Sequence, residues 1–201
     1  MTAKTDIRAA VLARRRRLPP EARAAAAKDV QAHLSNLVRR LRPDSVTGYV
    51  PVGSEPGGAD LPDAIVAALA GEGELLLPVL RKDLDLDWAS YAGPGTLVAA
   101  GRGMREPVGG RRGVAAVATA DLVVVPALAV DHRGVRLGRG GGSYDRALAR
   151  VGSGTLIVAL LHDGELVERL PAEPHDRPVD AVITASRGLL RLPLEGAAGA
   201  G

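Results

Sequence analysis

The most informative stretch of the chain is Arg136-Leu137-Gly138-Arg139-Gly140-Gly141-Gly142-Ser143-Tyr144-Asp145-Arg146. Its glycines allow positive φ angles, so backbone N–H groups can surround a bulky anion. Its arginines add forked donors that suit phosphate or carboxylate. An apolar run at residues 122–130 precedes the loop, and residues 144–151 can form a helix after it. Such a strand–loop–helix unit places the loop at the carboxyl end of a strand, where α/β sheets bind ligands.

The alternative for this loop is a flexible turn without a ligand. The flanking arginines and Asp145 favour an anion site instead. Two known phosphate-binding loops are excluded directly. A Walker loop ends in Gly-Lys-Ser/Thr, and no lysine follows Lys82. The dinucleotide fingerprint requires a third glycine where Ser143 stands, so this loop is of another type.

The segments around the loop predict an α/β fold. Helices are expected at residues 5–17, 21–41 and 59–70. Aliphatic and β-branched runs predict strands at residues 45–52, 74–79, 122–130, 155–161 and 181–184. The expected architecture is one domain, residues 1–195, in which helices flank a central, mostly parallel sheet. It has an N-terminal helical pair and carries the glycine-rich loop at a strand–helix junction. Strands within residues 84–113 cannot be located from the pattern, and the small residues at 196–201 predict a disordered tail.

Composition limits the class of protein. A chain of 201 residues with 46% apolar residues can bury one domain-sized core. Phenylalanine is absent and only Trp88, Tyr49, Tyr91 and Tyr144 are aromatic, so the core must be aliphatic. The absence of cysteine excludes disulfides and thiolate metal sites. No apolar run reaches the roughly 20 residues of a membrane span, and no apolar leader follows Met1, so a cytoplasmic protein without a membrane partner is expected.

The densest basic run is Arg14-Arg15-Arg16-Arg17, in a chain of net charge +3. Such a run can bind nucleic acid. Single-strand binders add stacking aromatic residues, however, and this region has none. Cations also stabilise the C-terminal end of a helix, and Pro19 and Pro20 follow closely. We therefore expect the solvated end of a helix and no nucleic-acid partner.

Several further blocks, taken with the loop, resemble a known family. They are Lys4-x-x-x-Arg8, Tyr49-Val50-Pro51-x-x-x-Glu55, Arg105-Glu106-Pro107, the loop itself after Asp131, and Pro171-x-Glu173-x-His175-Asp176-x-x-Val179-Asp180-x-Val182-Ile183-Thr184. In this order they are similar to the 5-formyltetrahydrofolate cyclo-ligases, also called methenyltetrahydrofolate synthetases. The loop and the last block are specific, whereas the others are weak individually. The resemblance spans residues 4–184, nearly the whole chain.

The resemblance implies an enzyme that uses ATP and Mg²⁺ to convert 5-formyltetrahydrofolate to 5,10-methenyltetrahydrofolate, releasing ADP and phosphate. Phosphorylation of the formyl oxygen would create a leaving group, and folate N10 would then close the ring. We expect Arg139 and Tyr144, both in the loop that matches the family's nucleotide loop, to be the catalytic residues. Its ATP-binding positions match Lys4, Arg8, Arg136, Leu137, Gly138, Arg139, Gly140, Gly141, Gly142, Ser143 and Tyr144.

Folate and metal positions follow from the same resemblance. The folate-binding positions match Val50, Glu55, Arg139, Gly140, Gly141, Gly142 and Ser143. A carboxylate such as Glu55 can accept paired hydrogen bonds from a pterin. Asp145 and Asp180 match metal-associated positions, and hard carboxylate oxygens suit Mg²⁺. His175 and Asp176 are expected to order their own loop. The alternative for Lys4, Arg8 and Glu55 is ordinary solvated side chains.

Two positions depart from the family pattern. Ser143 stands where family loops usually carry a second aromatic residue, and Glu165 stands where glutamine is frequent. Both changes bear on folate affinity and on preference for folate polyglutamates rather than on ATP chemistry. Two other interpretations stay open: a different nucleotide-handling enzyme that shares the loop, and a basic nucleic-acid-binding protein centred on residues 14–17. For the enzyme, we expect a monomer that acts on a small molecule.

Overall fold

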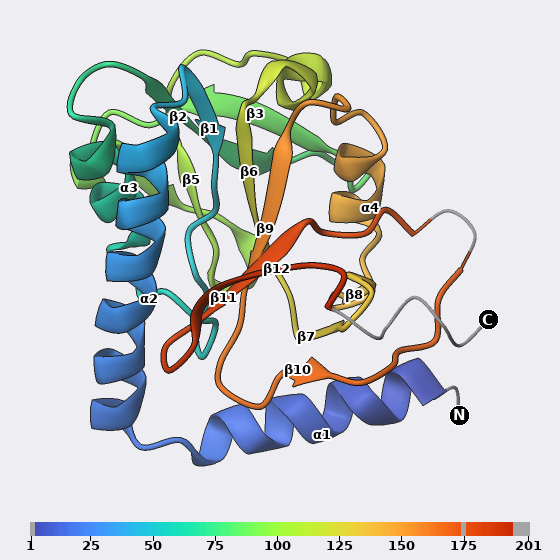
Figure 1. Cartoon of the computed structure of the whole chain (residues 1–201). Coiled ribbons are helices and arrows are strands. Elements are labelled where there is room, and N and C mark those ends of the chain that lie inside the picture. The colour runs from blue at the N-terminus through green and yellow to red at the C-terminus, as the bar shows by residue number, and fades with distance from the viewer. Residues whose placement is uncertain (1–2, 174–175, 195–201) are drawn as a thin grey trace.

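A computed structural model describes residues 3–173 and 176–194 (Figure 1). Its helices are α1 (Ala3–Arg17), α2 (Pro20–Leu41), α3 (Leu61–Leu69) and α4 (Ser143–Leu148), with 3-10 segments η1 (Pro94–Thr96), η2 (Gly101–Gly103) and η3 (Val114–Thr119). The strands are β1 (Ser45–Thr47), β2 (Glu74–Leu80), β3 (Leu86–Ser90), β4 (Leu97–Ala99), β5 (Arg105–Pro107), β6 (Leu122–Pro126), β7 (Ala129–Asp131), β8 (Arg136–Leu137), β9 (Leu156–Leu160), β10 (Leu166–Val167), β11 (Ala181–Thr184) and β12 (Gly188–Arg191).

The central sheet has the strand order β12-β11-β9-β6-β1-β2-β3. Neighbours from β11 to β2 pair in parallel, whereas β3 and β12 are antiparallel edge strands. Two smaller sheets, β10-β7-β8 and β4-β5, lie beside it. The prediction of an α/β fold with a mostly parallel sheet and an N-terminal helical pair is thereby confirmed.

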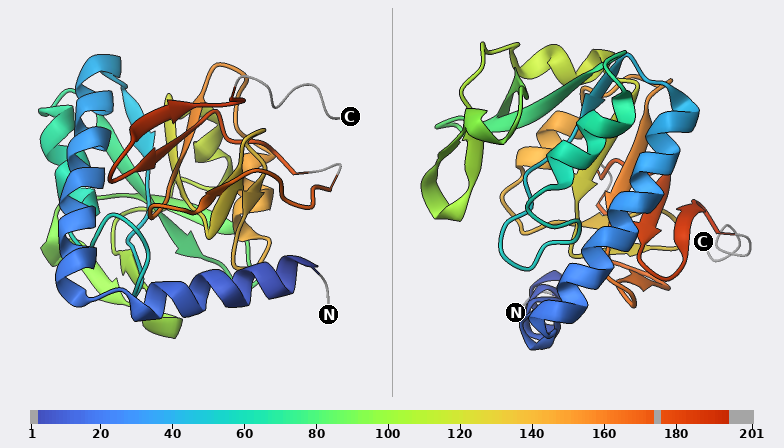
Figure 2. Two further views of the ribbon diagram at one scale, coloured as in Figure 1. Left: turned by 60° about the horizontal axis from the view of Figure 1, so that its bottom comes forward. Right: turned by 90° about the vertical axis from the view of Figure 1, so that its left-hand side faces the viewer.

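Side chains of the central strands alternate between two cores. On β6, Leu122 and Val124 pack with residues of α2 and α3, whereas Val123 and Val125 pack with residues of α4 and η3. Helices therefore cover both faces of the sheet, as parallel strands require. Figure 2 shows α2 and α3 together on one side and the β4–β5 hairpin projecting from the body.

Helix α1 lies apart from these two layers. It runs across the end of the molecule, close to β10, and is oriented across α2 (Figures 1 and 2). Its Ile7 packs against the small buried cluster of Ala129, Val135, Leu137 and Leu170. Pro20 occupies the first turn of α2, where its missing N–H has no intrahelical role. Helix α1 thus borders the segments that lead into the glycine-rich loop.

Two predicted strands are shorter than expected. The strand predicted at residues 45–52 ends at Thr47. In the segment that follows, Pro51 has no N–H with which to extend the strand pairing. The strand predicted at residues 122–130 breaks after Pro126 and resumes as β7. Both breaks occur where the chain turns to line a cavity. Strands β7, β8, β10 and β12 were not separately predicted, because they are only two to four residues long.

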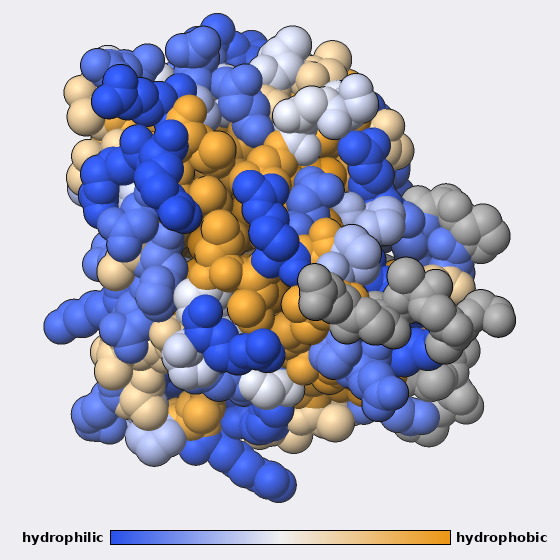
Figure 3. Space-filling model, in the orientation of Figure 1, coloured by the Kyte–Doolittle hydropathy of each residue, from blue (hydrophilic) through white to orange (hydrophobic). Residues whose placement is uncertain are grey.

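Figure 3 shows the surface of one face of the molecule. Hydrophobic residues form a band over the middle of the sheet, and hydrophilic residues border it on both sides. None of the described helices combines the length and hydropathy needed to cross a membrane. The segment predicted to be a disordered tail, residues 196–201, lies outside the described residues, as does His175.

Candidate active site

A cavity of about 270 Å³ opens beside the carboxyl ends of the parallel strands. It is bounded by the segment after β1, by β2, β3 and β5, by the β6–β7 corner, and by the loop between β8 and α4. The lining residues are Tyr49, Val50, Val52, Glu55, Pro78, Leu80, Leu86, Met104, Arg105, Glu106, Pro126, Ala127, Leu128, Arg136, Gly138, Arg139, Gly140, Gly141, Gly142, Ser143, Tyr144 and Asp145. The fold therefore brings the glycine-rich loop to the same cavity as Val50 and Glu55.

The glycines of the loop are required by its geometry. Gly140 and Gly142 have φ angles of 95° and 71°, in the left-handed region that side chains disfavour. A Cβ added at Gly138 would lie 2.7 Å from Nη1 of Arg136. The loop can thus turn tightly while bringing its backbone close to charged side chains.

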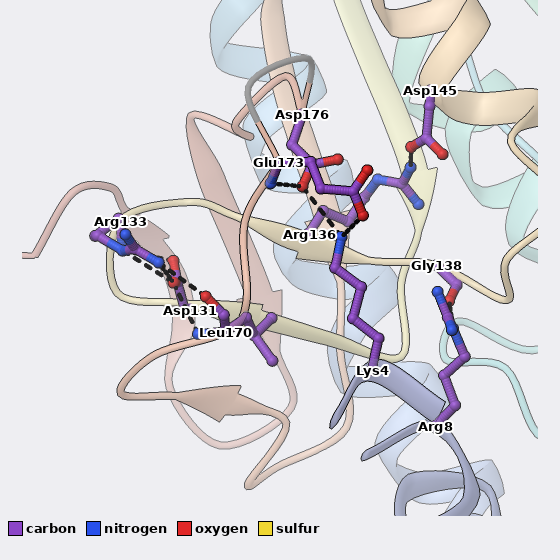
Figure 4. Close-up of polar contacts among 10 residues, drawn as sticks. All are labelled: Lys4, Arg8, Asp131, Arg133, Arg136, Gly138, Asp145, Leu170, Glu173 and Asp176. Atoms are coloured by element: carbon purple, nitrogen blue, oxygen red, sulfur yellow. Dashed lines mark hydrogen bonds and ion pairs between the residues drawn. The ribbon is translucent and has the colours of Figure 1, made fainter. Parts of the chain in front are cut away.

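Arg136 lies beneath this loop and is largely buried. Its Nη2 donates a hydrogen bond to Oδ1 of Asp145 at 2.5 Å (Figure 4). Its Nη1 donates to the Pro126 carbonyl at 3.3 Å. The guanidinium carbon lies 5.8 Å from the centre of the Tyr144 ring, a cation–π contact. Burial lowers the pKa of Arg136, although Asp145 and Tyr144 oppose this effect. Nε of Arg136 is buried without a hydrogen-bond partner among the described residues.

Glu55 and Arg139 connect the two sides of the cavity. Oε1 of Glu55 lies 3.1 Å from Nε of Arg139, and its Oε2 accepts a hydrogen bond of 2.8 Å from the Val52 N–H. The Glu55 side chain is only 11% exposed, whereas that of Arg139 is 53% exposed. Glu55 is therefore not the ordinary solvated glutamate that the sequence left as an alternative.

Two tyrosines add hydroxyl groups to the cavity lining. Burial raises the pKa of Tyr144, and the nearby Glu55 raises it further, so the phenol keeps its proton at neutral pH. Burial also raises the pKa of Tyr49, whose hydroxyl donates to the Pro56 carbonyl at 3.2 Å. Tyr49 thereby fixes the segment that carries Glu55.

Helix α1 brings Lys4 and Arg8 to one side of the loop region. Arg8 Nε donates to the Gly138 carbonyl at 2.9 Å. Lys4 Nζ lies 2.8 Å from Oε1 of Glu173 and 3.4 Å from Oδ2 of Asp176 (Figure 4). The hydrogen bond to Glu173 is the main cause of the raised pKa of Lys4. Neither residue lines the cavity, so both flank it.

The two carboxylates predicted to hold a metal occupy different surroundings. Asp145 lines the cavity and its side chain is 44% exposed. Asp180 precedes β11, where its Oδ2 accepts a hydrogen bond from the Ile157 N–H at 2.8 Å, and it does not line the cavity. Among the described residues, no group of three or more acidic, histidine or cysteine side chains is arranged to hold a metal ion. Asp176 accepts a hydrogen bond from the Glu173 N–H at 2.8 Å.

The basic run of α1 is not the uniformly solvated helix end that the sequence predicted. The side chain of Arg15 is 1% exposed and pairs with the fully buried Glu165. Arg14 lies 3.5 Å from the same carboxylate and donates to the Gly164 carbonyl at 3.0 Å. Arg15 is buried because the helical period places it on the same side of α1 as Arg8, where it faces a buried acid.

Sequence reasoning assigned no role to the hairpin residues Met104, Arg105 and Glu106, which line the cavity. Oε1 of Glu106 accepts a hydrogen bond of 2.9 Å from the Leu80 N–H and so joins the hairpin to β2. The block Arg105-Glu106-Pro107 was the available signal. Its position in space could not be derived, because the strands of that region had no clear pattern.

Fold and site together define an α/β protein whose cavity combines apolar walls with a glycine- and arginine-rich loop of a composition that suits an anionic ligand. The chain belongs to the 5-formyltetrahydrofolate cyclo-ligase family, whose model matches residues 1–185. The resemblance found in the sequence is thereby confirmed, and the protein is an enzyme of this ligase family.

Individual relatives agree with this assignment. The chain is 42% identical to a 5-formyltetrahydrofolate cyclo-ligase of Mycolicibacterium smegmatis over 94% of this chain and 97% of that protein. The solved structure of 5,10-methenyltetrahydrofolate synthetase from Aquifex aeolicus is similar with a TM-score of 0.78 and 31% identity, over 95% of this chain and 93% of that one. A 5,10-methenyltetrahydrofolate synthetase from Mycoplasma pneumoniae, at 16% identity, shares the fold with a TM-score of 0.72, over 92% and 99% of the two chains.

Proposed function

We propose that this enzyme converts 5-formyltetrahydrofolate to 5,10-methenyltetrahydrofolate with ATP and Mg²⁺, releasing ADP and phosphate. One observation carries the proposal: Arg139 of the glycine-rich loop lies 3.1 Å from Glu55, so the groups proposed to bind phosphate and pterin line one cavity. Family membership and the names of the relatives support the same substrate.

The chemical difficulty is that the oxygen of an N-formyl group is a poor leaving group. Transfer of the γ-phosphoryl group of ATP to that oxygen makes it a phosphate ester. N10 of the folate then attacks the formyl carbon, its proton is lost, and phosphate leaves with the former formyl oxygen. Positioning and charge neutralisation dominate phosphoryl transfer, so the protein needs fixed donors more than a strong base.

The loop supplies such donors. In this proposal Leu137, Ser143 and the glycine backbone hold the nucleotide, while Lys4 and Arg8 approach it from α1. Arg136 keeps a buried, partnerless Nε that a bound anion can satisfy. Arg139 and Tyr144 act at the transferred group, Arg139 as a cation and Tyr144 as a protonated hydrogen-bond donor.

The pterin is proposed to bind against Val50 and Glu55. Val50 is 8% exposed and gives an apolar wall, and Glu55 gives a carboxylate that can accept two N–H groups. Gly140, Gly141, Gly142 and Ser143 border the same space with small groups. A planar ring can therefore lie between the loop and the segment after β1.

Asp145 fits Mg²⁺ because it is a partly exposed carboxylate in the cavity beside the proposed phosphate donors. Mg²⁺ commonly keeps waters and uses one or two protein carboxylates plus phosphate oxygens, so few protein ligands are needed. The bound ion would neutralise phosphate charge. The resemblance implies the same role for Asp180, whose Oδ2 accepts a hydrogen bond from the Ile157 N–H and which does not line the cavity. We further propose that the enzyme acts as a cytoplasmic monomer.

The test is formation of the methenyl product, followed by its absorbance, from 5-formyltetrahydrofolate with ATP and Mg²⁺. Omission of ATP, or chelation of Mg²⁺, should abolish the signal. ATP binding without product would instead favour a different nucleotide enzyme that shares the loop. Steeply salt-dependent binding of nucleic acid would favour the basic-protein interpretation, although the burial of Arg15 speaks against a continuous basic surface.

A further inference from the structure

Arg15 forms a buried ion pair at the C-terminal end of α1. Its Nε and Nη2 lie 2.8 and 2.7 Å from Oε1 and Oε2 of Glu165. Both side chains are almost completely inaccessible to solvent. Glu165 also accepts a hydrogen bond of 2.9 Å from the His162 N–H. The pair therefore joins α1 to the turn between β9 and β10.

The same guanidinium reaches the wall of the cavity. Arg15 Nη2 donates to the Ala127 carbonyl at 2.7 Å, and Ala127 belongs to the β6–β7 corner that lines the cavity. The adjacent carbonyl, that of Pro126, accepts a hydrogen bond from Arg136. Two guanidinium groups, one on α1 and one on β8, thus hold neighbouring carbonyls of one corner.

Arg15 and Arg8 occupy the same side of α1, seven residues and about 10 Å apart along the helix. Arg8 contacts the glycine-rich loop through the Gly138 carbonyl. A helix held at two such points is fixed in rotation and in position along its axis. A shift or rotation of α1 at the Arg15 end would displace Arg8 relative to the loop.

Stability alone does not account for this arrangement. A buried ion pair is often no better than well-packed apolar residues of similar volume. Moreover, Nη1 of Arg15 is buried without a hydrogen-bond partner among the described residues, which is unfavourable. What the Arg15–Glu165 pair does provide is a fixed position for the β6–β7 corner at the cavity.

We propose that Arg15, held by Glu165, is a positioning residue that sets α1 so that Arg8 meets the glycine-rich loop, and thereby sets the affinity for ATP. This inference rests on the proposed use of ATP. It also assigns a purpose to Glu165 in place of the glutamine frequent in the family: a full carboxylate matches both donors of Arg15.

The test is a double-mutant cycle between Arg15→Lys and Arg8→Ala. Lysine keeps the charge but cannot bond both Glu165 oxygens and the Ala127 carbonyl in the same way. We expect Arg15→Lys to raise the KM for ATP by about tenfold, with kcat and the KM for folate changed less than about twofold. In the Arg8→Ala background the same change should raise the KM for ATP less than about threefold, because the positioned group is already absent.

Two matched controls accompany the cycle. Arg14→Lys changes the neighbouring arginine, whose side chain is about half exposed and lies 3.5 Å from Glu165. This variant should leave the ATP KM unchanged. Val30→Ala removes buried volume from α2 outside the cavity and reports what general destabilisation does. The inference would be overturned if Arg15→Lys and Arg8→Ala raised the ATP KM by independent factors that multiply in the double variant. It would also be overturned if Arg15→Lys raised the folate KM as much as the ATP KM, an effect that could pass through the contact of His162 with the Ser54 carbonyl.

If Arg15→Lys does not fold, Arg15→Met combined with Glu165→Leu replaces the ion pair by apolar side chains. This double variant should fold and should still have a raised ATP KM, and adding Arg8→Ala should change that KM little further. A normal ATP KM in the double variant would overturn the inference. A wild-type enzyme that forms no methenyl product with ATP contradicts the proposed function itself. An active wild-type enzyme with a multiplicative cycle contradicts only the role of Arg15.

Discussion

The Asp145 carboxylate contacts Arg136, with Oδ1 and Nη2 2.5 Å apart. The sequence predicts that Asp145 binds a metal and that Arg136 binds a phosphate. In the structure these two residues contact each other. Arg136 is the more buried partner, and its charge needs a nearby acid. An ion held by Asp145 would share this carboxylate with Arg136, and the charges of the nucleotide, the metal and the arginine would then be coupled at one position.

Asp145→Asn tests the metal role. The amide keeps the shape and an oxygen that can accept the Arg136 hydrogen bond, so folding should stay near normal. Loss of the negative charge should lower kcat about tenfold to hundredfold, with partial recovery as Mg²⁺ is raised. Steady-state rates over a Mg²⁺ titration measure this effect.

The competing role of Asp145 is local. It lies in the first turn of the short helix α4, where an acid stabilises a helix by about 0.3–1 kcal/mol. That role predicts a small loss in the free energy of unfolding with activity retained. Wild-type turnover of the variant at limiting Mg²⁺ would therefore assign Asp145 to the helix and to Arg136 alone.

Glu55→Gln should weaken folate binding and spare ATP binding. The amide replaces one acceptor with an ill-placed donor, a mismatch of about 1–3 kcal/mol in a buried site, or roughly tenfold in the folate KM. The change also weakens the contacts to Arg139 and to the Val52 N–H. Measurement of both KM values separates the effects; an unchanged folate KM would remove Glu55 from the pterin site.

Arg139→Ala should lower kcat more than it raises the ATP KM. A guanidinium beside the transferred phosphoryl group gains most in the transition state, and its loss is expected to cost about a hundredfold in kcat. Arg112→Ala is the matched control, because Arg112 is equally exposed and pairs with Glu74 outside the cavity. A raised KM with normal kcat would reassign Arg139 to ground-state binding.

The sequence predicted the sheet and the loop because both depend on local signals. Aliphatic runs such as residues 122–126 are long enough to identify a buried strand, and Gly140 and Gly142 are required by their own positive φ angles. The break after Pro126 was missed, because it depends on contacts made by Arg15 and Arg136 from distant parts of the chain.

Pairing between distant charges was also not predictable. Arg15 and Glu165 are 150 positions apart, and nothing in a basic run indicates which arginine turns inward. The family pattern gave Asp145 and Asp180 the same metal role, yet the fold puts only Asp145 in the cavity. Spacing along the chain does not report which side of a sheet a loop reaches.

Asp131 illustrates a buried acid whose role is structural. Its oxygens accept hydrogen bonds from the N–H groups of Arg133, Val135 and Leu170 at 2.9 to 3.0 Å, and Arg133 Nη2 lies 2.7 Å away (Figure 4). The bonds from Arg133 and Val135 close the turn between β7 and β8, directly before the glycine-rich loop, and the bond from Leu170 joins this turn to the segment after β10. Burial raises the pKa of Asp131, but the hydrogen bonds from Arg133 and the backbone outweigh it, so the pKa lies below its ordinary value of 3.8.

Asp131→Asn should therefore destabilise the protein in a pH-dependent way. Because the folded state lowers the pKa of this carboxyl, its stabilising contribution is complete above the unfolded value near 3.8 and disappears as the pH falls through the lower folded value. At pH 7 the variant should lose about 2–4 kcal/mol in the free energy of unfolding, since asparagine offers one acceptor and no charge. The difference from wild type should shrink below about pH 4. Urea unfolding at several pH values measures both; a difference that stays constant down to pH 3 would show that the ionised carboxylate does not hold this turn.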